Sequence, residues 1–171
     1  MMARSQTPAL FLVLGLILLS ACSAYRMGTA GDPGFRSIYI ETVQNETDAP
    51  QAVVPFTNAL NEAFIADGRV RPLSFPGNAD AILSVRLVRY ERILGAADPR
   101  DTALGESFYT ILTGRATLAG KDGTVYFQDR PFRVESAVLV REDLVQADYQ
   151  NIPVITRELA GKIVRSVVNT W

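Results

Sequence analysis

One apolar run, and the cysteine that follows it, decides how much of this chain can fold as a globular domain. Residues 9–19 (ALFLVLGLILL) carry no charge, and two small residues separate them from Cys22, the only cysteine of the chain. The run is too short for a helix that spans a bilayer, which needs about 20 residues. A polar start with Arg4, a short apolar centre and small residues before a cleavage point are typical of a signal peptide. We therefore predict that residues 1–21 are a signal peptide that is removed.

Residues 19–22 (LSAC) extend this prediction to lipidation. A branched apolar residue, two small residues and a cysteine resemble a bacterial lipobox. In such signals the cysteine thiol receives diacylglycerol and its freed amino group receives a further acyl chain, and two or more chains anchor stably. We predict that Cys22 is the lipidated first residue, that residues 22–36 form the lipidated N-terminus and tether, and that no cofactor is needed besides these acyl chains. Ser23 in place of Asp resembles Gram-negative lipoproteins of the outer membrane. The alternative is a plain signal peptide followed by an incidental cysteine.

The residue types that the sequence lacks narrow its chemistry. With no histidine and a single cysteine, the chain cannot build Ser–His or Cys–His catalysis, an internal disulfide or a cysteine zinc site. A net charge of −1 gives no reason to expect nucleic-acid binding. An enzyme based on Asp98, Asp101 and Glu106 is an alternative, although acids beside Pro and Gly are usually turn formers. We expect a protein that is not an enzyme and has no metal site.

Hydrophobic periodicity predicts the secondary structure of the remaining 150 of 171 residues. One domain, residues 37–171, can bury a core of its own at this length. Alternation and β-branched residues predict strands, and apolar residues at helical spacing predict two helices. The strands are expected at 37–43, 70–75, 81–93, 107–118 and 124–134, and the helices at 55–66 and 152–171, whereas 135–150 give an ambiguous pattern.

This order of elements predicts an α+β two-layer sandwich. One mixed or antiparallel sheet of about four strands would carry two helices on one face, and its other face would be solvated or a binding surface. Pro72 indicates an edge strand and Pro131 a bulge or an edge, since proline has no N–H for a central ladder. Gly68 is expected to end the first helix in a left-handed conformation, and Asp122-Gly123 to form a hairpin turn.

Several segments, taken together, resemble a known family. The segments are Cys22 with Tyr25-Arg26, SIYI at 37–40, QNET at 44–47, TNAL at 57–60 with Phe64, DGR at 67–69, NADAIL at 78–83 and the closing helix. Their types and order, over nearly the whole mature chain, resemble the lipopolysaccharide-assembly lipoprotein family LptE. The resemblance implies an outer-membrane lipoprotein, facing the periplasm, that partners and plugs the β-barrel LptD and assists lipopolysaccharide transport. It also implies that the protein is not an enzyme.

Lipopolysaccharide would need cations that meet its phosphates, and arginine suits them through its bidentate geometry. Alternation along 81–93 predicts Leu83, Val85 and Leu87 on one face and Arg86 and Arg92 on the other. Three further arginines lie on later strands that could sit beside them. The hypothesis is therefore a lipopolysaccharide site that consists of Arg86, Arg92, Arg115, Arg130 and Arg133. The alternative is that these arginines are solvated or form surface ion pairs.

A second functional hypothesis shares the anchor and the fold. The chain could be another periplasm-facing lipoprotein module of an envelope or secretion complex, with a different protein partner. Nothing in the residue pattern alone separates this module from a barrel plug, whose surface must be of mixed polarity because barrel interiors are polar.

Overall fold

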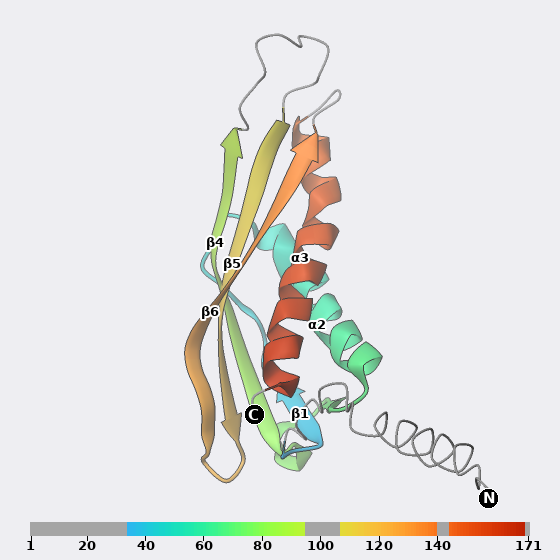
Figure 1. Ribbon diagram of the computed structural model, residues 1–171, viewed down its shortest axis with the longest axis vertical. Helices are drawn as coiled ribbons and strands as arrows, with labels where there is room; N and C mark the ends of the chain where they lie inside the picture. Colours follow the sequence, from blue (N-terminus) through green and yellow to red (C-terminus); the bar gives the residue numbers. More distant parts are fainter. Residues whose placement is uncertain (1–33, 95–106, 140–143, 170–171) are drawn as a thin grey trace, which may run out of the picture. The chain divides into compact units, whose positions relative to one another are not determined.

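Three long antiparallel strands form the centre of the fold, as Figure 1 shows. They are β4 (Ala81–Leu94), β5 (Ser107–Gly120) and β6 (Val125–Leu139). The computed structural model describes residues 34–94, 107–139 and 144–169. The β5–β6 hairpin confirms the predicted turn, because Gly123 has φ 88°, a value that favours glycine.

Short strands complete the sheet on the β4 side. β1 (Ser37–Ile40) runs parallel to β4 and, on its other side, to β3 (Arg71–Leu73), while β2 (Gln44–Asn45) also pairs with β4. The strand order is β3-β1-β4-β5-β6, and β2, which pairs with β4 outside this order, brings the described sheet to six strands where about four were expected. The predicted strand 37–43 is split into β1 and β2. Ile40 pairs with Leu83 and Gln44 with Arg86, so four residues on this side face three on β4, and the regular pairing is interrupted between the two strands.

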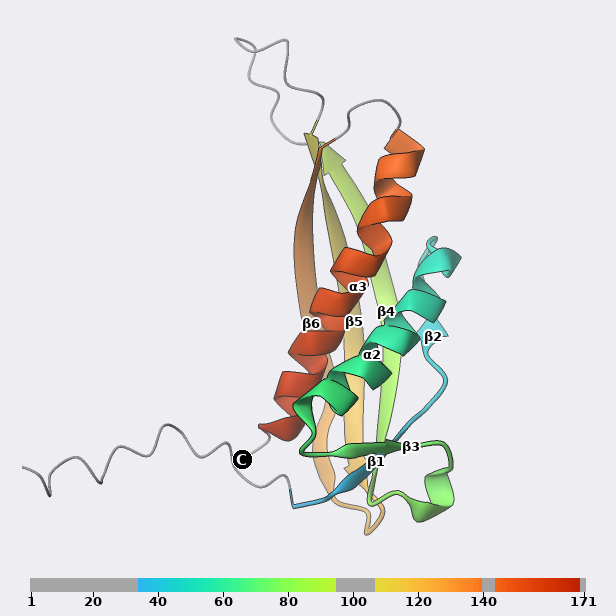
Figure 2. The same cartoon turned by 90° about the vertical axis from the view of Figure 1, so that its right-hand side faces the viewer.

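Two helices cover one face of the sheet (Figure 2), as predicted. A short 3-10 turn (Pro50–Ala52) leads into α2 (Val53–Asp67), and Gly68 ends that helix with φ 73°, which confirms the predicted left-handed cap. A second 3-10 turn (Pro76–Asn78) precedes β4.

The last helix, α3 (Leu144–Val168), begins eight residues before the predicted start at 152. The ambiguous segment 135–150 therefore contains both the end of β6 and the first turns of α3. Pro153 lies inside the helix and lacks the N–H that would bond to the carbonyl of Tyr149. This proline, and the polar Asp148 and Asn151 before it, made the earlier turns hard to predict.

The core lies between the helices and the sheet. Fully buried side chains come from both layers: Phe56, Leu60 and Phe64 of α2, Ile155, Leu159 and Ile163 of α3, and Leu83, Leu87, Leu112 and Leu118 of the sheet. Burial of each such side chain contributes about 1.5–3 kcal/mol. Gly114 of β5 allows α3 to come close, because a Cβ there would lie 3.3 Å from Cδ2 of Leu159.

Of the three register shifts in the described ladders, two determine on which face the arginines lie. The β4–β5 register shifts between Leu87 and Arg89, so that Val88 is an extra residue. The β5–β6 register shifts opposite Thr117, where Asp129 has φ 48°. Because successive side chains alternate between faces, one extra residue reverses every assignment beyond it. The prediction that Arg86 and Arg92 share a face is therefore wrong.

Other sequence predictions can be compared with this architecture. The edge position predicted from Pro72 is confirmed, and of the two alternatives for Pro131 the edge is the one observed, since β3 and β6 are the outer strands. In the part of the chain that the structure describes, no helix has the length and apolar character needed to cross a membrane. Cys22 with residues 1–21, and the acids of the alternative enzyme site (Asp98, Asp101, Glu106), lie outside the described residues.

Candidate binding surface on the open sheet face

The face of the sheet opposite the helices, here called the open face, carries charged side chains in rows across β4, β5 and β6. Strand pairing defines four rows: Arg86–Arg115–Pro131, Arg89–Thr113–Arg133, Glu91–Ile111–Glu135 and Ile93–Tyr109–Ala137. Their neighbours along the strands, such as Leu87, Leu112 and Val134, are buried beneath the helices. The open face therefore presents four arginines, here called the arginine band (Arg86, Arg115, Arg89 and Arg133), then Glu91 and Glu135, and then an apolar row. The apolar row lies near the C-terminal end of β4, which is the upper end of that strand in Figure 1.

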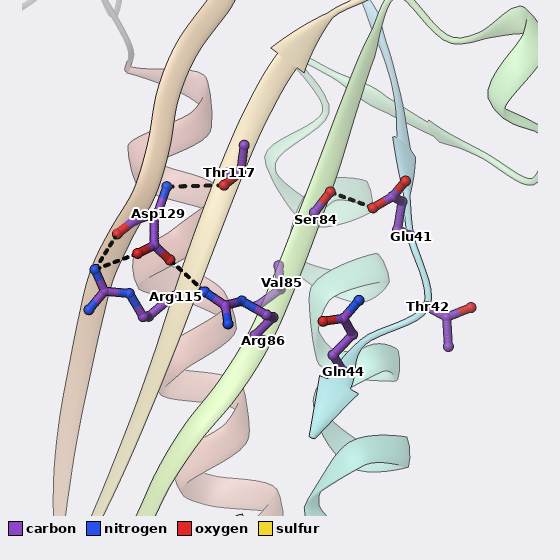
Figure 3. A pocket seen from close by; sticks show the side chains of 9 residues that line it. All are labelled: Glu41, Thr42, Gln44, Ser84, Val85, Arg86, Arg115, Thr117 and Asp129. Carbon is purple, nitrogen blue, oxygen red and sulfur yellow. Dashed lines mark hydrogen bonds and ion pairs between the residues drawn. The ribbon is translucent and has the colours of Figure 1, made fainter. Parts of the chain in front are cut away.

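Asp129 joins the two arginines of the first row. Arg86 and Arg115 are direct cross-strand partners, an arrangement of like charges that is unfavourable by itself. Asp129 relieves it, because Arg86 Nη2 donates to its Oδ1 at 2.8 Å and Arg115 Nη2 lies 2.7 Å from its Oδ2 (Figure 3). Thr117 Oγ1 accepts the Asp129 N–H at 3.0 Å, and this bond holds the irregular backbone in place.

The electrostatics of this cluster are balanced. The hydrogen bond from Arg115, with a further one from Arg86, holds the pKa of Asp129 below its usual range. Glu46 lies 2.9 Å from Arg86 and is the main cause of the raised pKa of that arginine, followed by Asp129. Two arginines and two carboxylates cancel, so an incoming anion must replace a carboxylate that is already present.

A shallow pocket lies beside the cluster (Figure 3). Its walls come from β4, β5, the Asp129 irregularity and the segment that joins β1 to β2, where Glu41 accepts a hydrogen bond from Ser84. The pocket can hold water or a small polar group. In the described residues, no three acidic, cysteine or histidine side chains gather as a metal site would require.

The second row holds two more exposed arginines. Arg89 and Arg133 pair with Glu91 and Glu135 of their own strands at 3.2 and 3.3 Å. These pairs flank Ile111, which is only 4 % exposed although it points away from the helices. Surface ion pairs of this kind contribute about 0–1 kcal/mol, so both arginines can exchange a carboxylate for a phosphate at little cost.

The remaining two predicted arginines face α3. Arg92 Nη1 lies 3.6 Å from Asp148 Oδ2. Arg130 lies over the Phe127 ring at 4.6 Å and donates to Ser166 Oγ at 2.8 Å. The structure thus brings Arg86, Arg115 and Arg133 together on the open face but not the other two.

Sequence reasoning missed three members of this surface: Arg89, Asp129 and Glu46. Arg89 reaches the open face only through the extra residue Val88, for which the sequence has no signal. Asp129 had a weak signal, since aspartate is among the few residues that tolerate a positive φ. Glu46 was considered only as part of QNET at 44–47, one of the segments that carry the family resemblance.

Comparison with known families decides the identity of the domain. The family model LptE, described as lipopolysaccharide-assembly, matches residues 35–171. The chain belongs to the LptE family. The match begins at the start of the described domain and extends to the last residue, so the resemblance predicted from the sequence is confirmed.

Solved structures share the fold at low sequence identity. A protein from Xanthomonas campestris is 11 % identical with a TM-score of 0.57, and covers 80 % of this chain and 85 % of its own. A minor lipoprotein from Acinetobacter baumannii is 14 % identical with a TM-score of 0.55, and covers 79 % of this chain and 94 % of its own. A hypothetical protein from Chlamydia trachomatis is 8 % identical with a TM-score of 0.51, and covers 78 % of this chain and 98 % of its own. These similarities establish the fold alone. No curated protein matches the sequence.

Proposed function

We propose that this LptE-family protein is an outer-membrane lipoprotein that partners and plugs the β-barrel LptD and assists lipopolysaccharide transport. Its family membership supports a role in lipopolysaccharide assembly. The observation that carries the proposal is the banding of the open face, where the arginine rows lie beside the exposed Ile93 and Tyr109. Lipopolysaccharide has the same sequence of chemistry, with phosphates next to acyl chains. A face of mixed polarity also suits the polar interior of a barrel.

The arginine band is the proposed lipopolysaccharide site, now with Arg89 as a member. Arg92 and Arg130 are proposed to hold α3 instead, because their contacts are Asp148 and Ser166. The site works by exchange, in which phosphate oxygens take the place of Asp129 or Glu46 on a guanidinium.

Binding of purified lipopolysaccharide tests this site. Changing Arg86→Gln together with Arg115→Gln should weaken binding about tenfold or more, since each charge-assisted hydrogen bond contributes about 1.5–3 kcal/mol. Asp129→Asn should strengthen binding, because it removes the competing carboxylate and keeps a side chain that tolerates positive φ. Arg157→Gln, an exposed arginine of α3, is the matched control. Equal affinity of the double variant, the control and the unchanged protein would remove these arginines from the site.

Lipidation is tested at Cys22. The Cys22→Ala protein should lose labelling by a radioactive fatty acid and leave the membrane fraction, because one acyl chain gives marginal anchoring and none gives less. A Ser23→Ala protein should keep its label. Persistent labelling of Cys22→Ala would contradict the assignment.

Partnership is tested by purification of the tagged protein from solubilised outer membranes. A large β-barrel should co-purify. Repeated absence of the barrel, together with normal surface lipopolysaccharide after depletion of the protein, would favour the alternative of another envelope module.

A further inference from the structure

Two edges of the sheet are blocked against further pairing. β3 has only three residues, and Pro72 is the middle one. On β6, Pro131 has no N–H, and the carbonyl of Arg133 accepts a hydrogen bond from Lys162 Nζ at 3.0 Å. Proline, lysine and short length are the means by which natural sheets prevent the addition of another strand.

The upper half of β4, residues 88–94, is a third edge that is longer than β3 and holds no proline. Its protection consists of the irregularity at Val88 and the charges of Arg89, Glu91 and Arg92. β2 accompanies β4 only as far as the bond from Glu46 N–H to the Leu87 carbonyl, at 2.8 Å. Beyond that bond, within the described residues, no strand pairs with this side of β4. Seven residues of strand extend over about 23 Å, a usual strand length. We refer to residues 88–94 as the β4 free edge.

The direction of the backbone groups follows from the register. In an antiparallel ladder, alternate residues direct both N–H and C=O to the same neighbour. The outward carbonyl of Arg133 means that its partner Thr113 bonds to β4, and Thr113 pairs with Arg89. We therefore infer that the backbone groups of Arg89, Glu91 and Ile93 bond to β5. Those of Tyr90 and Arg92 point the other way in the plane of the sheet, toward the free edge.

A second copy of the chain does not fit this edge. The antiparallel register that pairs Arg89 with Glu91 of a second copy would place Ile93 beside Leu87, whose carbonyl is already bonded to Glu46. The neighbouring registers, which clear β2, place Glu91 opposite Glu91 or Arg92 opposite Arg92. Like charges directly opposite each other destabilise a strand pair.

The charges along the edge indicate what does fit. Arg89 and Arg92 lie three residues apart on opposite faces, and their side chains are 62 % and 49 % exposed. Neither is tightly held, because Arg89 pairs with Glu91 of its own strand and Arg92 is 3.6 Å from Asp148. Two acidic residues three apart on an added strand would reach both arginines.

We propose that the β4 free edge accepts an extended, acidic segment of the β-barrel partner as an added strand. This inference rests on the proposed function, which supplies the partner. Main-chain hydrogen bonds to Tyr90 and Arg92 would give affinity, and the two arginines would select for acidic residues.

Two substitutions at one position separate backbone pairing from charge. Arg92→Thr and Arg92→Pro both remove the guanidinium, but only the proline removes the outward N–H, and proline is tolerated at an edge. The tagged full-length variants are purified with their barrel from solubilised membranes. The proline protein should recover about tenfold less barrel than the threonine protein, since it loses one hydrogen bond and blocks its neighbours. Matching thermal unfolding of the two variants checks that both fold.

Equal barrel recovery by the two variants would overturn the added strand while leaving the proposed function intact. Hydrogen exchange provides a second measurement on the unchanged protein: the amides of Tyr90 and Arg92 should exchange more slowly in the barrel complex than in the isolated protein. Unchanged exchange would also overturn the inference. If the unchanged protein recovers no barrel at all, the proposed function itself fails.

Discussion

The two halves of α3 are held to the sheet by different chemistry. The C-terminal half packs beside α2 (Figure 1), and its Ile155, Leu159 and Ile163 are fully buried among apolar neighbours. The N-terminal half buries Asp148 and Asn151, each 7 % exposed. Tyr90 Oη donates to Asp148 Oδ1 at 2.6 Å, and Ser136 Oγ donates to Asn151 Oδ1 at 2.8 Å.

This difference separates global stability from local position. Apolar packing tolerates small shifts and contributes most of the folding free energy, whereas buried hydrogen bonds contribute about 0.5–1.5 kcal/mol each but require one geometry. Pro153 stands between the halves and interrupts the helical bonding to Tyr149. The N-terminal half should therefore open at a lower free energy than the C-terminal half.

The largest effect on stability is expected from Leu159→Ala in the apolar half of α3. Leu159 is fully buried and packs at Gly114, so truncation leaves a cavity. We expect the free energy of unfolding to fall by about 2–5 kcal/mol in urea titration. Val154→Ala, at a position 52 % exposed on the same helix, should change it by less than about 0.5 kcal/mol. A loss at Leu159 no greater than that of the control would contradict the division.

A smaller and more local effect is expected from Asp148→Ala in the polar half. The change leaves the hydroxyl of Tyr90 without its acceptor and removes the ion pair of Arg92. Loss of a buried partner costs about 1–3 kcal/mol. Hydrogen exchange should accelerate in residues 145–152 and stay unchanged in residues 159–168. Equal acceleration along the whole helix would show that α3 opens as one unit.

The smallest effect concerns Tyr90→Phe and its dependence on pH. Burial, and then the hydrogen bond to Asp148, raise the pKa of Tyr90 well above its ordinary value. In the unfolded chain the phenol ionises near pH 10, while the folded state keeps its proton. The stability from this group is therefore present below pH 10 and is lost as pH rises further.

The Phe variant should lose about 0.5–1.5 kcal/mol at pH 7. Between pH 9 and pH 11, its unfolding temperature should fall less than that of the unchanged protein. The other tyrosines titrate in both proteins, so the difference between the two isolates Tyr90. Parallel curves would mean that the phenol of Tyr90 is not held in its neutral form.

Periodicity predicted what depends on local patterns. The buried Phe56, Leu83 and Ile155 follow from apolar spacing, and Pro72 and Pro131 identified the edges because a missing N–H is a property of the residue itself. The start of α3 was not predictable, because Asp148 and Asn151 interrupt its apolar stripe with side chains that are buried through partners distant in sequence.

The candidate site was predicted only in part, because its members depend on the register of the strands as well as on local patterns. Arg86, Arg115 and Arg133 share the open face as the hypothesis required, but Arg92 does not and Arg89 takes its place. Face assignments hold only while the register is regular, and one extra residue in a ladder has no compositional mark.

Val88 therefore gives β4 an unusual tolerance to one change in length. Loss of a residue from a regular strand exchanges the two faces of everything beyond it. Loss of Val88 would instead remove the one residue that the ladder passes over, because Leu87 pairs with Gly114 and Arg89 with the next residue, Thr113. Arg89 and Glu91 would stay on the open face, and Tyr90 would stay beside Asp148. A deletion of a single codon here should therefore make the strand regular and preserve both the arginine band and the polar contacts of α3.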